Sequence, residues 1–239
     1  MVLIFDISSN IAMFRKPYTT TSLISYPFPP PTAVAGLLGA MTGLDNQADS
    51  EGAGSAAFWD YMTGTRIAIG LKKPLRWLTT TVNLIKFKNP NGDMSEHIQA
   101  KHQMVKDPVY RIYVSGGDIY NELKRRLEND EFVYTPYLGV AYALADIEYI
   151  GEFEEKTANN NYADTIIPVY GNVVVDIKKS ISIHKELAPY RMNCKRGAIQ
   201  TVSVFYPEYQ LSKKLWMKDQ GDVQITQVGE ERVAWFEAW

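Results

Sequence analysis

Three residues in the sequence carry the side chains that metal-free cleavage of RNA requires. They are Tyr26, in a proline-rich stretch, and the adjacent Lys101 and His102. An imidazole or a phenolate can take the proton of a ribose 2′-hydroxyl, and a lysine can stabilise the charge of the phosphorane that follows. Separation along the sequence does not fix the distances between these side chains, so cleavage is one of several alternatives that stay open.

Signatures of other enzyme classes and of metal sites are absent from the sequence. Three histidines and one cysteine, Cys194, do not make a structural zinc set at the usual spacings. There is no nucleophile elbow, no Walker A loop and no dinucleotide-binding GxGxxG unit. Cys194 has no neighbouring base and is interpreted as an inert thiol. We therefore expect neither a metal nor another cofactor.

Basic residues gather on segments that suit contacts with a nucleic-acid backbone. Arg15 and Lys16 are the only cations before residue 45, and they lie in a hydroxyl-rich loop with Tyr18 and Thr19 that Pro17 keeps open. Such a loop favours phosphate contacts combined with base stacking. Thr32 follows three prolines at the start of a predicted helix, where free backbone amides favour an anion. The alternative is an ordinary surface loop.

A second basic region covers residues 66–111, with nine Lys and Arg against three Asp and Glu. It includes Lys101 and Arg111, and a smaller cluster of Arg191, Lys195 and Arg196 lies further along the chain. A localised groove for a polyanion and a solvated charged face are both compatible with this pattern.

The whole chain is nevertheless slightly acidic. Its 239 residues include 27 Asp and Glu and 25 Lys and Arg, for a net charge of −2, which argues against histone-like binding. Hydrophobic residues make up 46% and charged residues 22%, as in ordinary folded proteins. No apolar stretch approaches the length that spans a bilayer, and no export signal opens the chain. We expect a cytoplasmic protein without membrane contact.

Periodicity predicts an α+β fold. Apolar alternation indicates strands near residues 1–8, 66–72, 109–114 and 146–153, separated by helices near 33–42 and 119–128. Thr32 and Asp118 are the predicted N-caps, and Gly43 and Asp130 are the predicted ends. This order is that of a ferredoxin-like (RRM-like) palm. A β-rich arm is inserted at about 77–106.

The predicted domain plan has three parts. Residues 1–153 form the palm with its inserted arm, residues 154–164 form a linker, and residues 165–239 form a smaller C-terminal β region. In that last part we expect strands at 166–177, 181–184, 199–206 and 223–228. Whether the arm is an insertion or supplies a strand to the palm sheet stays open.

Several blocks of the sequence resemble the Cas5 family of CRISPR-associated proteins. Residues 14–21 and 25–39 match its N-terminal signature of prolines, small residues and glycines, and residues 106–114 and 134–139 resemble later blocks. The resemblance covers most of the first 153 residues.

The resemblance implies an RNA-recognition-like palm with an inserted thumb, in the RAMP superfamily, within a type I Cascade surveillance complex. Its members hold the 5′ handle of the CRISPR RNA and cap the backbone filament beside the large subunit, so target DNA is met only indirectly. In the type I-B branch, which this sequence resembles most, the subunit is noncatalytic. In the type I-C branch it is a processing endoribonuclease that uses tyrosine, lysine and histidine, and Tyr26, Lys101 and His102 fall near those positions.

We therefore expect a noncatalytic subunit that binds the handle, with a metal-independent endoribonuclease as the alternative. A generic RNA-binding module and a purely architectural protein are the other hypotheses. The residues expected to contact RNA are Arg15, Lys16, Tyr18, Thr19, Tyr26, Thr32, Lys101, His102, Gln103, Arg111, Arg191, Lys195 and Arg196.

Overall fold

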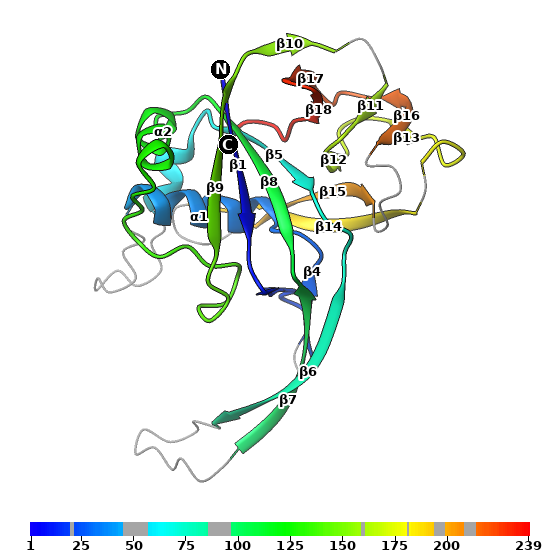
Figure 1. Cartoon of the computed structure of the whole chain (residues 1–239). Helices are drawn as coiled ribbons and strands as arrows, with labels where there is room; N and C mark the ends of the chain where they lie inside the picture. The colour runs from blue at the N-terminus through cyan, green and yellow to red at the C-terminus, as the bar shows by residue number, and fades with distance from the viewer. Residues whose placement is uncertain are drawn as a thin grey trace.

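The first strand, β1 (Val2–Ser8), lies inside an antiparallel sheet, as its two apolar faces predict. It pairs with β8 (Val109–Ser115) on one side and with β9 (Asp146–Phe153) on the other, and β5 (Arg66–Leu71) completes the order β5-β8-β1-β9. We call this sheet the palm sheet (Figure 1). The mixed α+β class predicted from the sequence is confirmed.

The computed structural model describes residues 1–19, 22–44, 57–85, 97–158, 161–180, 182–193, 199–207 and 214–239. Two α-helices lie within these ranges, together with a short 3-10 helix, η1 (Ala57–Met62), which is rich in aromatic residues.

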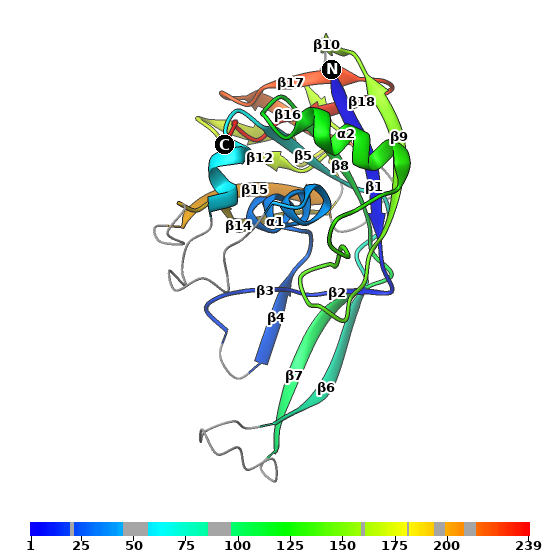
Figure 2. The same ribbon diagram turned by 90° about the vertical axis from the view of Figure 1, so that its left-hand side faces the viewer.

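Helix α1 (Pro31–Thr42) carries no charged residue and is apolar on most of its surface, so it has to be buried on more than one side. It packs on the palm sheet, and strand β14 (Ile183–Arg191) lies on its other side (Figure 2). Gly43 ends α1 in the left-handed conformation, as predicted. The predicted N-cap, Thr32, was wrong: Pro30 is the cap residue and α1 begins two residues earlier than predicted, at Pro31.

Helix α2 (Tyr120–Asn129) covers the same face of the palm sheet. Its buried residues Leu123 and Leu127 join the main core, and Asp130 ends it in the left-handed conformation, as predicted. The predicted N-cap Asp118 was wrong, because Ile119 occupies that position and no side chain caps the helix.

The arm is a long antiparallel ribbon of β6 (Trp77–Ile85) and β7 (His97–Lys106) that extends away from the palm (Figure 1). It does not add a strand to the palm sheet. Instead, β7 also pairs with β2 (Ile11–Ala12) and, in parallel, with β4 (Ser22–Tyr26), which in turn pairs with β3 (Phe14–Arg15).

Strand β7 has little signal of its own in the sequence, where it is a polar segment before Asp107 within the predicted β-rich arm. Its lysine, histidine and glutamines have low strand propensity, but partners on both edges satisfy the backbone hydrogen bonds. The Asn89-Pro90-Asn91-Gly92 sequence favours a turn, and it lies outside the described residues.

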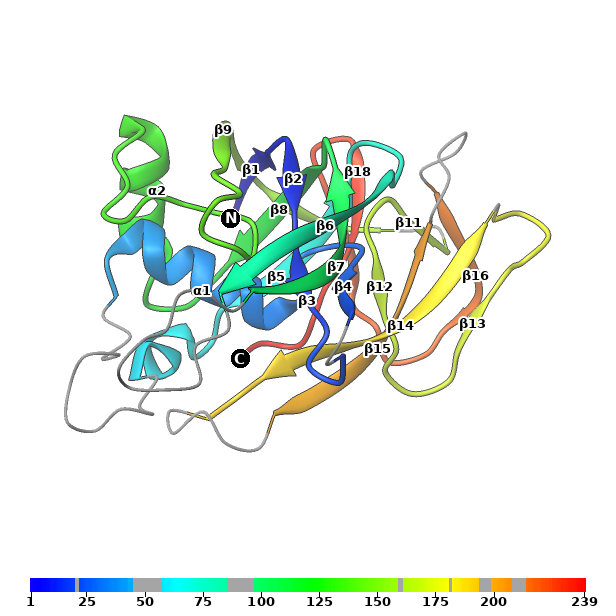
Figure 3. The ribbon, with the colours of Figure 1, turned by 90° about the horizontal axis from the view of Figure 1, so that it is seen from below.

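Short sheets make up the C-terminal β region, on the side of the palm away from α2 (Figure 3). Their strands are β10 (Glu155–Thr157), β11 (Tyr162–Ala163), β12 (Ile167–Pro168), β13 (Val173–Val175), β14, β15 (Gln200–Pro207), β16 (Leu215–Gln220), β17 (Ile225–Val228) and β18 (Glu231–Ala234).

The strand expected at 166–177 is divided into β12 and β13. The strand expected at 181–184 is longer, since β14 continues to Arg191. Part of the segment 154–164 is also strand, because β10 pairs with β17 and β11 pairs with β16.

The second face of the palm sheet is covered by the β17–β18 hairpin. Val233 and Trp235 pack against Val2 and Ile4 of β1 in a small buried cluster. The guanidinium of Arg66 lies 4.8 Å from the centre of the Trp235 ring. The β17–β18 hairpin therefore covers the apolar part of this face of the palm sheet.

A network of charged side chains joins the same hairpin to the palm. Arg111 donates two hydrogen bonds to Asp6, at 2.6 and 2.8 Å, and a third to Glu231 at 2.9 Å. Tyr113 and Lys72 also donate to Glu231. Burial raises the pKa of Glu231, but the hydrogen bonds from Tyr113 and Arg111 outweigh burial, and the net pKa is lowered.

We predict that Glu231→Gln destabilises the fold at neutral pH. The amide cannot balance the charges of Arg111 and Lys72, so the free energy of unfolding should fall by about 1.5–3 kcal/mol. The lowered pKa of Glu231 means that its contribution is fully present above the pKa of an unfolded glutamate, about 4.3, and is lost as pH falls further. Urea titrations should therefore show that the difference in the free energy of unfolding between Glu231→Gln and wild type shrinks below a pH of about 4. The control is Glu230→Gln, an exposed neighbour; equal losses in both variants would contradict the role of the network.

Candidate nucleic-acid interface

An exposed row of polar side chains crosses the base of the arm. Lys101 of β7 pairs with Ser22 of β4 on one side and Thr81 of β6 on the other. Residues opposite one another in a sheet point to the same face. All three side chains are exposed, so an ammonium and two hydroxyls share one surface.

The next row on this face combines polar and apolar side chains. Gln103 lies between Ile24 and Thr79 in the register, and Ile24 and Thr79 are exposed. Trp77, at the start of β6, is 38% exposed. Ser22, Thr79 and Thr81 were not predicted as site residues, because only the register of three strands distant in sequence brings them beside Lys101.

His102 lies on the opposite face of the same ribbon. Neighbouring residues in a strand point to opposite sides, and His102 is only 5% exposed while Lys101 is exposed. Among the described residues, neither ring nitrogen of His102 has a hydrogen-bond partner. The imidazole is therefore a buried side chain and is not presented beside Lys101.

The loop between β3 and β4 lies next to this ribbon and presents two exposed groups. Arg15 is exposed and donates to the carbonyl oxygen of Thr19 at 3.1 Å, and Tyr18 is 68% exposed. Thr19 donates from its hydroxyl to the carbonyl of Lys16 at 2.9 Å, which closes the turn. The loop thus offers a guanidinium and an aromatic ring to a ligand.

Lys16 is held differently from its neighbour Arg15. Its ammonium pairs with Glu186 of β14 at 2.5 Å and lies 5.2 Å from the centre of the Tyr26 ring. Both partners of the ion pair are largely shielded, with 14% and 16% of their side chains exposed. This ion pair therefore links the β3–β4 loop to β14 of the C-terminal region.

Tyr26 is buried where β4 pairs with Phe14 of β3. Burial, followed by the neighbouring Tyr18 and Glu186, raises the pKa of Tyr26 to about 12. The phenol is therefore protonated at neutral pH and is a poor base. Tyr26 and His102 are both buried, and His102 points away from the exposed Lys101, so these three residues form no open catalytic cluster.

The remaining predicted contacts lie elsewhere. Thr32 is half-buried in the first turn of α1, where Pro31 has no N–H and the amides of Ala33 and Val34 donate to Pro30, so few amides are left for an anion. Arg111 is held by Asp6 and Glu231. Arg191 is half-buried at the end of β14, and the last two predicted contacts, Lys195 and Arg196, lie outside the described residues.

The described residues show neither a metal site nor a membrane-spanning helix. They contain no group of three or more His, Cys, Asp or Glu side chains arranged to hold a metal ion. Within the same ranges, neither helix has the length and apolar character that crossing a membrane demands.

Comparison with known proteins gives a consistent set of relatives. A family model described as CRISPR-associated protein (Cas_Cas5) matches residues 2–192. A chain of a structure titled CRISPR RNA-guided surveillance complex superposes with a TM-score of 0.54 and 11% identity, over 91% of this chain and 92% of that one. The crystal structure of a CRISPR protein from Archaeoglobus fulgidus gives a TM-score of 0.54 and 16% identity, over 98% of both chains. No curated protein matches the sequence.

We predict that His102→Leu stabilises the free protein. The imidazole is buried without a hydrogen bond, and a leucine of similar size removes that cost, so the free energy of unfolding should rise by about 1 kcal/mol. Chemical denaturation measures the change. Lys101→Leu, on the exposed face, should change stability by less than about 0.5 kcal/mol and serves as the control. A marked loss of stability in His102→Leu would mean that the imidazole is hydrogen-bonded in the folded chain.

Proposed function

Because the chain belongs to the Cas5 family of CRISPR-associated proteins, we propose that it is a noncatalytic subunit that binds the 5′ handle of CRISPR RNA. Acting in the cytoplasm, it caps the backbone filament of a type I Cascade complex, next to the backbone and large subunits. The observation that carries this proposal is the exposed surface at the base of the arm, where Lys101 lies between the hydroxyls of Ser22 and Thr81. Arg15 and Tyr18 are exposed on the neighbouring strand β3 and on the loop that follows it.

This surface has the chemistry that single-stranded RNA requires. A guanidinium and an ammonium bind phosphates, hydroxyls accept or donate hydrogen bonds to ribose, and an exposed tyrosine stacks on a base. The exposed Lys101 lies on β7, and the exposed Arg15 lies on β3. Arg15 pairs with Ser25 and so points to the opposite face from Ser22 and Lys101, which means that a strand of RNA contacting both cations passes around the β3 edge of this sheet. In this proposal Lys16 supports the loop through Glu186, and Arg111 supports the palm.

The arrangement of the palm supports the same assignment. The palm sheet has the chain order β–α–β–β–α–β with strand order β5-β8-β1-β9, which is the ferredoxin-like arrangement that we propose for the palm. The β6–β7 ribbon is then the thumb, at 77–106, and residues after about 165 form the C-terminal region. The likeness to a chain of an RNA-guided surveillance complex supports this fold.

The noncatalytic assignment, typical of a type I-B subunit, rests on two physical points. A phenol with a pKa of about 12 gives little phenolate at pH 7, and a buried imidazole on the far face cannot reach a ribose bound beside Lys101. General base catalysis needs a group within hydrogen-bond reach of the proton and with a pKa near the working pH.

We predict that Arg15→Ala combined with Lys101→Ala weakens binding of handle RNA. Each phosphate contact with a single strand contributes about 0.7 to the slope of log affinity against log salt, so losing two should flatten the slope by about 1.4. Fluorescence anisotropy with labelled handle RNA at several salt concentrations measures it. The matched control removes the same two charge types far from this surface, at Arg125 of α2 and Lys178 after β13. Equal effects in both double variants would contradict the proposed surface.

We predict that the purified protein binds repeat RNA in EDTA without cutting it. Gel analysis after prolonged incubation should show intact RNA with the wild type, Tyr26→Phe and His102→Ala. An alkaline digest of the same RNA marks the positions of products. Products formed by the wild type and lost in His102→Ala would establish the endoribonuclease alternative instead.

A further inference from the structure

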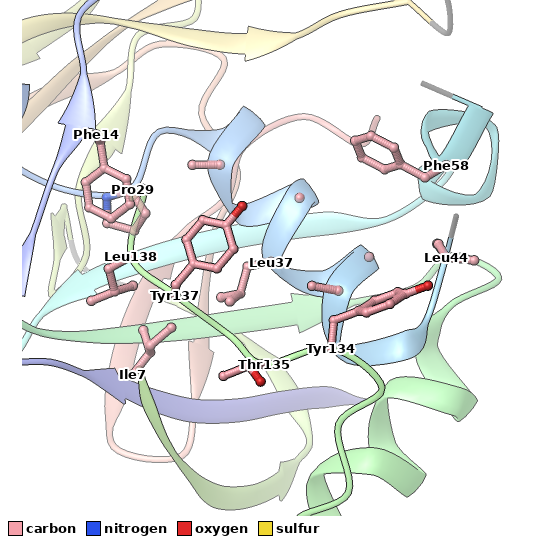
Figure 4. Close-up of a pocket in the computed structure, with 15 residues that line it drawn as sticks. Ile7, Phe14, Pro29, Leu37, Leu44, Phe58, Tyr134, Thr135, Tyr137 and Leu138 are labelled. Carbon is pink, nitrogen blue, oxygen red and sulfur yellow. The ribbon is translucent and has the colours of Figure 1, made fainter. Parts of the chain in front are cut away.

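A cavity of about 600 Å³ opens beside α1, on surface that the proposed RNA site does not use. Residues 134–139 form one wall, and α1 forms the floor (Figure 4). Phe58 of η1 and Leu44 lie toward one end, and Phe14 and Pro29 lie at the other (Figure 4).

The floor of this cavity is made of small residues. Ala33, Gly36 and Ala40 recur every three or four positions, so they share one side of α1, and Gly36 is exposed. A Cβ atom built on Gly36 would meet no atom within 4 Å, so the space above it is open. The floor has room for an inserted side chain.

Aromatic rings line the wall and remain exposed. Tyr134 is 54% and Tyr137 is 47% exposed, and both line the cavity. Near the wall along the chain but outside the lining, Val133, Tyr142 and Leu144 are also exposed, at 44%, 57% and 60%. Large exposed apolar groups at a cavity are typical of interaction sites.

The wall is held in place before any ligand binds. The amide of Tyr134 donates to the carbonyl of Ala40 at 3.1 Å, and the amide of Met13 donates to the carbonyl of Leu138 at 3.0 Å. Gly139 adopts a φ of +84°, and a Cβ there would lie 2.1 Å from the carbonyl oxygen of Met13. Only glycine permits this close approach, so the cavity is a preformed feature.

The charges around the cavity do not suit a phosphate backbone. The sequence has no Lys or Arg at residues 17–65 or at residues 127–155, and these two segments supply nearly the whole lining. Of the cations nearest along the chain, Lys16 pairs with Glu186 and Arg126 with Glu122. Arg15 follows the lining residue Phe14 in β3 and so points to the opposite side of that strand.

Acidic residues lie close to the wall along the chain. Asp130 and Glu131 come just before it, and both are exposed. An apolar cavity with acidic residues beside it is complementary to an apolar side chain with basic neighbours.

We infer that this surface docks a protein segment that inserts an apolar anchor side chain flanked by Lys or Arg. Resting on the proposed function, the occupant is a neighbouring subunit of the Cascade complex. The RNA and the protein partner then bind at different surfaces of the chain: RNA binds at the base of the arm, and the subunit binds beside α1.

Photo-crosslinking in the assembled complex tests which molecule occupies the cavity. Benzoylphenylalanine replaces Tyr137 in one sample and Tyr18, in the proposed RNA surface, in another. We expect the probe at position 137 to label a protein subunit, at a peptide with an apolar residue next to Lys or Arg, and the probe at position 18 to label RNA. Labelling of RNA from position 137, or no product there, would overturn the inference. If the probe at position 137 labels a subunit but the probe at position 18 labels no RNA, the result would count against the proposed function and not against this inference.

A peptide assay tests the chemistry without the complex. A short fluorescent peptide with leucine and phenylalanine between lysines should bind the wild-type chain, and a peptide with glutamates in place of the lysines should bind about tenfold more weakly. Gly36→Phe, which fills the open space, and Tyr134→Ala should each weaken binding about tenfold.

The control variant is Tyr61→Ala, a tyrosine that is also 54% exposed but does not line the cavity. It should leave peptide binding unchanged, and Gly36→Phe should leave affinity for handle RNA unchanged. Equal binding of both peptides, or equal binding by the wild type and Gly36→Phe, would overturn the inference even if the RNA results hold.

Discussion

The uncharged helix α1 is the constraint on which the rest of the structure depends. Between Pro31 and Thr42 it has no charged side chain, and its only polar side chains are those of Thr32 and Thr42, so other parts of the chain must cover most of it. The palm sheet covers one side, β14 from the C-terminal region covers another, and the segment after α2 hydrogen-bonds along its last turns. Because the segments that pack on α1 come from distant parts of the sequence, α1 joins the palm to the C-terminal region.

Covering α1 and the sheet also determines where the RNA-binding surface that we propose can lie. Helices occupy one face of the palm sheet, while β17 and β18 pack on the apolar part of the other, and the charged network holds Arg111 below them. Exposed hydroxyls and unshielded cations are then presented by the arm and the loop beside it. A chain with a net charge of −2 can in this way offer a local surface for a polyanion.

Features set by local pattern could be predicted from the sequence, and features set by long-range pairing could not. The two-sided strand at residues 2–8, the end of α1 at Gly43 and the buried face of α2 follow from periodicity and glycine conformation. Strand β7 has little local signal, because its stability comes from partners on both edges. For the same reason no local signal revealed that Arg111 meets Glu231, 120 residues away, or that Lys16 meets Glu186.

The register of β7 places the side chains of two adjacent residues, a lysine and a histidine, on opposite faces of the ribbon. Pairing with β6 and β4 points Lys101 outward and His102 inward. A slip of one residue would exchange their faces, exposing the imidazole and burying an ammonium without a partner, which costs several kcal/mol. Two strands on opposite edges oppose that slip at the same residues. Under the proposed function, strand pairing therefore decides whether this surface binds RNA or cleaves it, because the same lysine and histidine would serve either purpose.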